Sequence, residues 1–206
     1  MTEILDIHPV NPELRKISQA AAVIRRGGLV VYPTDSCYAF GFHMGDKAAT
    51  REIQRIRQTP KAHNFTLVCR DLAEIATYAR VENWCYRALK AHTPGPYTFI
   101  LTATRTVPRR LQNPKRKTVG IRVPDHPVPQ ALLAELNEPL MSSSLKLPGE
   151  ELPMTDIDEM FARLQGEVDL IIDSGSCGIM PTTVVDLTGE FPVVVREGKG
   201  GHQDFV

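Results

Sequence analysis

The feature that most constrains the fold is an apolar run at residues 29–32, LVVY, which leads directly into the polar loop Pro33-Thr34-Asp35-Ser36. A run of this length is typical of a buried strand and is too short to cross a bilayer. Pro33 fixes the backbone at the end of the strand, and the hydroxyls of Thr34 and Ser36 both donate and accept hydrogen bonds. Ligands gather at the carboxyl ends of strands in open α/β sheets. Residues 30–41 therefore predict a strand followed by a ligand-binding loop, although a helix cap or an ordinary turn also fits the loop taken alone.

Strand patterns and helical patterns alternate along the rest of the chain. Helix starts are predicted at Asn11, with Pro12 in the first helical position, at Asp46, and at Thr155, which would form a capping box with Asp158. Strands are predicted at residues 29–32, 65–69, 97–102, 119–123, 140–144, 170–172, 183–187 and 192–196. This order favours an α/β fold in which helices flank a mixed sheet, organised as a single domain over residues 1–206.

Composition excludes several classes of protein. The chain is 42% hydrophobic and 23% charged, which rules out wholesale disorder. Its cysteines form no C-x-x-C pair and its histidines show no metal-ligand spacing, so we expect buried thiols and no structural metal. The first residues carry acids and lack the basic and long apolar regions of a signal peptide. We expect a cytoplasmic protein that does not associate with membranes.

Charge is unevenly distributed along a chain whose net charge is zero. Residues 83–124 contain no acid, whereas residues 150–173 are rich in acids. A basic stretch of one sign is a candidate site for an anionic ligand such as a nucleotide or RNA, although a solvated basic loop fits equally well. The candidate RNA-binding residues are Arg105, Arg109, Arg110, Lys115, Arg116 and Lys117.

Three further segments combine strand or helix ends with polar side chains. Arg57, Lys61 and His63 follow a predicted helix, where they would grip phosphates or simply complement the helix dipole. Three successive serines at residues 142–144 lie in a predicted strand, and burying hydroxyls without partners costs free energy. They indicate either a polar site or a solvated edge strand. Thr182 and Arg196, on the last two predicted strands, complete the set.

Taken together and in order, these segments resemble the YrdC/YciO family of threonylcarbamoyl-adenylate synthases, most closely its YciO branch. No one segment is specific, but the combination spans residues 27–198. The matching pieces are GGLVVYPTDSCYAFG, the helix ending in IRQTP, TPGPYTFIL, KTVGIRVPDHP, PLMSSSLKLPG and PTTVVDL followed by VVVREG.

The resemblance implies a twisted open sheet with a large concave basic cavity. It implies L-threonine, bicarbonate and ATP as substrates, with Mg²⁺ on the triphosphate, and threonylcarbamoyl-AMP and pyrophosphate as products. The adenylate would serve the t6A modification of transfer RNA. The family has also been associated with double-stranded RNA, so binding of tRNA, rRNA or double-stranded RNA is a second implied role.

The resemblance also assigns roles to individual residues. Arg57 and Ser144 would take part in catalysis. Threonine would be bound by Thr34, Ser36, Arg122, Ser142 and Thr182, with Arg122 clasping its carboxylate. The nucleotide would be bound by Arg57, Thr59, Lys61, His63, Thr118, Ser144, Lys146 and Arg196.

Two motifs of the family are altered in this sequence. The second basic residue of the K-x-R motif is Thr59, and the asparagine of the S-x-N motif is Lys146. Losing one charge-assisted hydrogen bond costs about 1.5–3 kcal/mol, so three hypotheses follow. The protein is a synthase of reduced activity, an RNA-binding protein of the same fold, or an adenylate-forming enzyme for another small carbamate or amino acid.

Overall fold

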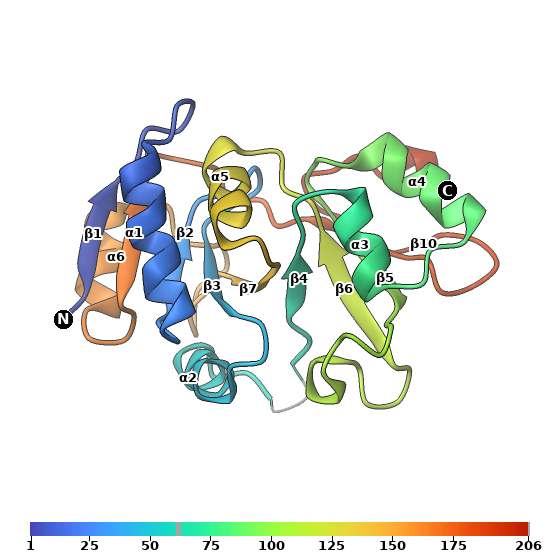
Figure 1. The fold of residues 1–206 in the computed structure, drawn as a ribbon, viewed down its shortest axis with the longest axis horizontal. Helices are drawn as coiled ribbons and strands as arrows, with labels where there is room; N and C mark the ends of the chain where they lie inside the picture. The colour runs from blue at the N-terminus through green and yellow to red at the C-terminus, as the bar shows by residue number, and fades with distance from the viewer. Residues whose placement is uncertain (61–62, 206) are drawn as a thin grey trace.

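The computed structural model describes residues 1–60 and 63–205 of the chain, and its strands form one mixed sheet (Figure 1). The sheet order is β1-β8-β2-β3-β7-β4-β6-β5-β9-β10. The strands are β1 (Glu3–Asp6), β2 (Val30–Tyr32), β3 (Ala39–His43), β4 (Thr66–Val68), β5 (Tyr97–Thr102), β6 (Thr118–Arg122), β7 (Leu140–Ser144), β8 (Leu170–Asp173), β9 (Thr183–Asp186) and β10 (Val193–Arg196). The helices are α1 (Leu14–Arg25), α2 (Lys47–Arg57), α3 (Leu72–Tyr78), α4 (Asn83–His92), α5 (Pro127–Leu136) and α6 (Ile157–Leu164), with short 3₁₀ turns η1 (Arg109–Leu111) and η2 (Gln203–Phe205).

Strand directions are mixed, as the sequence predicts. The pairs β1–β8, β2–β8, β4–β6 and β5–β9 are parallel, whereas β2–β3, β3–β7, β4–β7, β5–β6 and β9–β10 are antiparallel. The predicted α/β fold with a mixed sheet flanked by helices is therefore confirmed.

Two apolar clusters hold the helices against the sheet. Val30 and Tyr32 of β2 pack in the cluster that contains the apolar faces of α1 and α5, which lie side by side in Figure 1. Val31, between them, joins the larger cluster that contains residues of α2, α3, α4 and α6. This alternation is the two-residue period of a strand with both faces covered. Within the described residues, no helix has the length and apolarity needed to cross a membrane.

In the second half of the sheet, the same alternation separates core from cavity. Val119 and Ile121 of β6 are buried in the larger cluster. Thr118, Gly120 and Arg122 of the same strand line a cavity. β5 repeats this alternation, with Phe99 and Leu101 in the larger cluster and Thr98 and Ile100 at the cavity. Two neighbouring strands therefore turn one face to the core and the other to the cavity.

Two strands are absent from the sequence prediction. β1 has four residues, and β3 follows the 33–36 loop at once with a glycine in its centre. Gly41 has a structural role there, because a Cβ atom at this position would lie 2.8 Å from the ring of Tyr32. The 33–36 loop is therefore the connection between antiparallel β2 and β3, not only the end of one strand.

Two predicted helix starts are wrong by one or two residues. α1 begins at Leu14 with Glu13 in the capping position, and the residues before it form a separate turn in which the Asn11 N–H donates to His8 Nδ1. Pro12 therefore precedes the helix. α6 is capped by Asp156, not Thr155, since the Asp156 carboxylate accepts a hydrogen bond from the Glu159 N–H at 2.8 Å. The predicted cap at Asp46 is confirmed by its bonds to the N–H groups of Ala48 and Ala49.

Candidate active site

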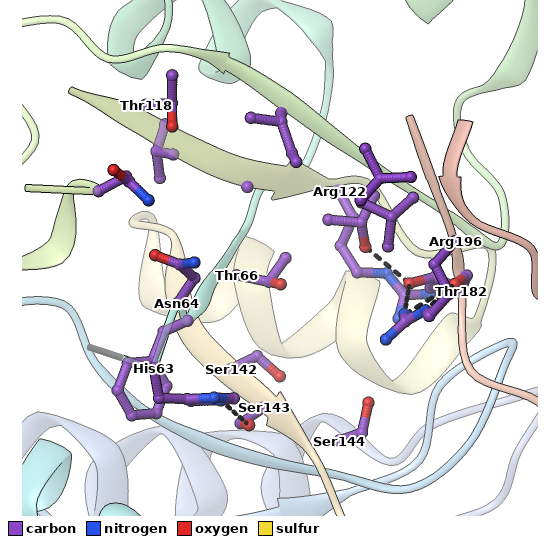
Figure 2. Close-up of a pocket in the computed structure, with 18 of the residues that line it drawn as sticks. His63, Asn64, Thr66, Thr118, Arg122, Ser142, Ser143, Ser144, Thr182 and Arg196 are labelled. Atoms are coloured by element: carbon purple, nitrogen blue, oxygen red, sulfur yellow. Dashed lines mark hydrogen bonds between the residues drawn. The ribbon is translucent and has the colours of Figure 1, made fainter. Parts of the chain in front are cut away.

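A cavity of about 350 Å³ opens on the polar face of the central strands (Figure 2). Its volume suits a small-molecule ligand. Four guanidinium groups and His63 line it, and none of its described lining residues is an aspartate or a glutamate. The hydroxyl and amide groups that line it belong to Asn64, Thr66, Thr98, Asn113, Thr118, Ser142, Ser143, Ser144 and Thr182.

Arg57, His63 and Ser143 meet at one end of the cavity. Arg57 is the last residue of α2, and Gln58 adopts a left-handed conformation with φ 49°, which turns the chain back toward the cavity. Arg57 Nη1 lies 2.9 Å from His63 Nε2 and also donates to Ser143 Oγ. His63 Nε2 is 3.1 Å from the same Ser143 Oγ. Arg57 Nε donates to the backbone carbonyl of Lys146 at 3.2 Å, which fixes the guanidinium in place.

Electrostatics at this end favour uncharged neighbours for the arginine. Burial and the charge of Arg57 lower the pKa of His63 to about 4, so the imidazole is neutral at physiological pH. Burial also lowers the pKa of the Arg57 guanidinium, which nevertheless stays charged. Burial raises the pKa of the Cys37 thiol, which lines the cavity nearby. This end of the cavity therefore carries the positive charge of Arg57 among uncharged neighbours.

The serine strand is an interior strand, so the edge-strand alternative is wrong. β7 lies between β3 and β4. Ser142 accepts a hydrogen bond from Tyr32 Oη at 2.8 Å and donates to the Phe40 carbonyl at 2.9 Å. Ser143 is buried against Arg57, whereas Ser144 is half-buried at the cavity wall. Each buried hydroxyl thus has a partner, as buried polar groups require.

Arg122 lies at the opposite end of the cavity, in a buried ion pair with Asp35. Its Nη1 donates to Ser36 Oγ at 3.2 Å. Its Nε is buried and has no hydrogen-bond partner among the described residues, and the same holds for Asp35 Oδ2. Ser36 Oγ is 3.0 Å from Thr34 Oγ1, so the loop after β2 supports the arginine with two linked hydroxyls.

Another part of the cavity wall is formed by Thr182, directly before β9, and Arg196, the last residue of β10. Arg196 Nη2 donates to the Thr182 carbonyl at 2.8 Å and to its Oγ1 at 3.2 Å. Thr182 Oγ1 also lies 2.8 Å from Thr98 Oγ1 on β5. Figure 2 shows Arg122, Thr182 and Arg196 together on one side of the cavity, opposite His63 and Ser143.

The predicted basic stretch divides into two groups. Arg116 lines the cavity and donates to Asp186 Oδ2 and Thr188 Oγ1, both at 2.7 Å. Arg105, Arg109, Lys115 and Lys117 are exposed. For Arg110, only the backbone is described, as part of η1.

Several predicted site residues lie outside the cavity wall. Thr34 lines a second, more open cavity with Asp35, His126 and Lys199. Thr59 Oγ1 is buried without a partner among the described residues, and the side chain of Lys146 is exposed. Lys61 lies outside the described residues.

Sequence reasoning missed several polar residues of the site. Asn64 and Thr66 follow His63 at the start of β4, and Thr98 contacts Thr182 from β5. Asp35 was noted in its loop but not as the partner of Arg122. The alternation along β4 and β5 indicates which threonines face away from the core. No local pattern indicates the pairing of Asp35 with Arg122, which are 87 residues apart in the sequence.

Comparisons with known proteins show the family and the fold. The family model Sua5_yciO_yrdC, described as telomere recombination, matches residues 22–198. The chain is 54% identical to the uncharacterized protein YciO of Escherichia coli K12 across the whole of both chains. The crystal structure of E. coli YciO superposes with a TM-score of 0.96 and also covers 100% of both chains.

Two less similar relatives have more informative names. A threonylcarbamoyl-AMP synthase of Hydrogenovibrio crunogenus is 33% identical over 72% of this chain and 81% of its own. The crystal structure of Sua5 from P. abyssi complexed with L-threonine has a TM-score of 0.89 and 26% identity, covering 98% of this chain and 59% of that one. The resemblance found from motifs is thus confirmed over most of the sequence and in the fold, and the chain belongs to the Sua5/YciO/YrdC family.

Proposed function

We propose that this protein forms threonylcarbamoyl-AMP from L-threonine, bicarbonate and ATP. The observation that carries the proposal is a cavity in which Arg57, Arg122 and Arg196 meet hydroxyl groups, with no carboxylate among its described lining residues. Such donors suit two anionic substrates, a carboxylate and a polyphosphate. The relative named threonylcarbamoyl-AMP synthase and the Sua5 structure that holds L-threonine support the same reaction.

We assign threonine to the Arg122 end. Arg122 is buried and lines the cavity, so its guanidinium is the group that a carboxylate would meet at this end. Ser36 and Thr182 supply hydroxyls on either side of it, and Ser142 lines the cavity floor. Asp35 supports the arginine from behind, which holds the guanidinium still before the substrate arrives.

We assign the ATP phosphates to the Arg57 end, with the nucleoside along Thr118 and Arg116. Arg57 is held by the Lys146 carbonyl and faces Ser143. Ser144 lines the cavity, and Arg196 lies beside Arg122 and Thr182. We place the α-phosphate between Ser144 and Arg196, where it would meet the threonine carbamate.

The reaction needs positioning more than covalent chemistry. Bicarbonate takes up a proton and loses water to give carbon dioxide. The threonine amine attacks this carbon dioxide, which gives a carbamate and returns the proton. A carbamate oxygen then attacks the α-phosphorus, the bond to the bridging oxygen breaks, and pyrophosphate leaves with the electron pair. Holding the two anions together and spreading charge over phosphate oxygens lowers the barrier. The adenylate product would serve the t6A modification of transfer RNA in the cytoplasm.

Mg²⁺ would enter with the triphosphate as part of the substrate. The described lining residues of the cavity offer guanidinium, hydroxyl and amide groups, whereas a protein site for Mg²⁺ needs carboxylates. The chain's own contribution is the set of cations that hold the phosphates.

We expect a low rate. Thr59 stands where the family motif has a second basic residue, and its Oγ1 is buried away from any described partner. Lys146 contributes only its backbone carbonyl to the site, and its side chain is exposed. Each missing charge-assisted hydrogen bond costs about 1.5–3 kcal/mol, or roughly tenfold to a hundredfold in rate.

The test is a pyrophosphate-release assay with ATP, Mg²⁺ and bicarbonate, with and without threonine. We expect threonine-dependent release, and loss of that dependence in Arg122→Ala. Arg51→Ala is the matched control, because Arg51 is exposed on α2 away from the cavity. Absence of threonine-dependent release overturns the proposal, and release with another amino acid instead would identify an adenylate-forming enzyme of different specificity.

A second candidate function is RNA binding by the exposed part of the basic loop. Arg105, Arg109, Lys115 and Lys117 project into solvent on a segment that borders the cavity through Arg116. Binding through phosphates would weaken steeply with salt, because counterions are released on association. Replacing Lys115 and Lys117 by alanine should reduce the slope of log K against log salt by about one for each phosphate that is no longer neutralised. A slope that does not change rules out this surface.

A further inference from the structure

The cluster formed by Arg57, His63 and Ser143 has a hydrogen-bond arrangement that fixes the state of the histidine. Arg57 Nη1 and Ser143 Oγ both approach His63 Nε2, at 2.9 Å and 3.1 Å. A guanidinium nitrogen can only donate. Nε2 must therefore be an acceptor, which makes His63 the neutral tautomer with its proton on Nδ1.

The groups that face His63 explain why it stays neutral. Arg57 reaches it from the end of α2, Ser143 from β7, and the Phe65 ring meets it edge-on with ring centroids 5.1 Å apart. Burial and the Arg57 charge both oppose protonation of the imidazole. The Cys37 thiol near Arg57 is neutral because burial raises its pKa. Of the remaining guanidiniums of the cavity, those of Arg116 and Arg122 are paired with Asp186 and Asp35, whereas that of Arg196 adds positive potential.

An anion at this point would reverse the balance. A phosphate oxygen that accepts from Arg57 neutralises the charge that disfavours protonation, and the same oxygen offers Nε2 a hydrogen-bond acceptor. Both changes favour the imidazolium. We propose that Arg57, His63 and Ser143 form a polyphosphate clamp in which His63 takes up one proton as the anion binds. The free site would then have one permanent cation, and the occupied site two.

The clamp also supplies a proton donor for the reaction, a step that rests on the proposed function. When the bond between the α-phosphorus and the bridging oxygen breaks, the electron pair passes to that oxygen of the pyrophosphate. The proton on His63 Nε2 moves to the pyrophosphate, and the imidazole returns to the neutral form that accepts from Arg57. Charge and protons are conserved in this step. The clamp then has one positive charge fewer, which eases release of the pyrophosphate.

The clamp is tested by binding alone, without turnover. The side-chain NMR signals of the histidines are followed against pH in the full-length protein, with and without inorganic pyrophosphate, and His63→Asn identifies the His63 signals. We expect pyrophosphate to raise the pKa of His63 by about two or more, a shift typical of a nearby opposite charge. A His63 that stays neutral with pyrophosphate bound overturns the proposal, and so does failure of pyrophosphate to bind.

A second variant separates the electrostatic cause from a packing role. In Arg57→Gln the free protein should show a higher His63 pKa than the unmodified protein, because the opposing charge is gone. Pyrophosphate should then change that pKa much less. Equal pyrophosphate-induced changes in the two proteins would contradict the coupling.

In the pyrophosphate-release assay, His63→Asn should retain threonine dependence and lose the pH dependence that a proton donor imposes. A pH profile that does not change overturns the donor role, whereas absence of turnover in the unmodified protein concerns only the proposed function.

Discussion

The carboxylate of Asp35 and the guanidinium of Arg122 form an ion pair between the two cavities, with 9% of each side chain exposed. Removing one partner leaves an uncompensated buried charge. We predict that Asp35→Ala lowers the free energy of unfolding by about 3–5 kcal/mol. Urea denaturation measures the change, and the exposed Glu151→Ala, within about 0.5 kcal/mol of the unmodified protein, is the control.

The double variant Asp35→Ala/Arg122→Ala distinguishes the pair from two independent effects. Because both charges are removed together, its loss of stability should be smaller than the sum of the two single losses. A strictly additive result would mean that the pair contributes no coupling energy.

Tyr32 and Ser142 form a second coupled pair beneath the cavity. The Tyr32 hydroxyl is fully buried, and burial raises its pKa to about 12, so it acts as a neutral donor to Ser142 Oγ. Ser142→Ala leaves that hydroxyl without its acceptor, and we predict a loss of about 1–3 kcal/mol. Adding Tyr32→Phe should recover part of the loss. Thermal or urea unfolding of the four proteins of the cycle measures it, and no recovery would show that the hydroxyl finds another partner.

The low pKa of His63 predicts a dependence of stability on pH. The unfolded chain holds a proton on this residue below about 6.5, whereas the folded protein does so only below about 4. Between these values the unfolded state binds more protons. The contribution of His63 to the free energy of unfolding is therefore full above pH 6.5 and is lost as pH falls toward 4. In His63→Asn the fall in unfolding free energy between pH 7 and pH 4.5 should be smaller. Equal falls in the two proteins would mean that His63 takes up its proton at the same pH in the folded and unfolded states.

The cavity floor predicts a steric test. A Cβ atom at Gly120 would lie 3.3 Å from Thr98 Cγ2 and 3.7 Å from Thr66 Oγ1, so a larger side chain must project into the cavity. We predict that Gly120→Val weakens ATP binding at least tenfold in calorimetric titration. Gly189→Ala, in an exposed turn with ordinary contact distances, is the matched control. ATP binding unchanged by Gly120→Val would place the nucleotide away from this floor.

Local patterns predicted the elements whose periodicity is strong. The bounds of β5 and β7 agree with the predicted residues 97–102 and 140–144. β1 and β3 were missed because each is short, and β3 carries a glycine that packing against Tyr32 requires. Local propensity does not reflect packing requirements of this kind between neighbouring strands.

The site was predictable as a set of residues but not as a set of pairs. Arg57, Arg122, Thr182 and Arg196 were named from loops and resemblance, and all four line the cavity. Their partners depend on the order of strands in the sheet. Ser143 meets Arg57 and His63 only because β7 is inserted between β3 and β4, and no local pattern fixes that insertion.

The alternating faces of β5 and β6 have a consequence for how this scaffold changes over time. Most residues that hold the strands against the helices alternate in sequence with residues that line the cavity, and only Val119 of these two strands belongs to both described sets. Substitutions in the cavity can therefore accumulate while the apolar half of each strand, and with it the folded architecture, is preserved. A chain of this kind can change its ligand specificity while it keeps the same fold.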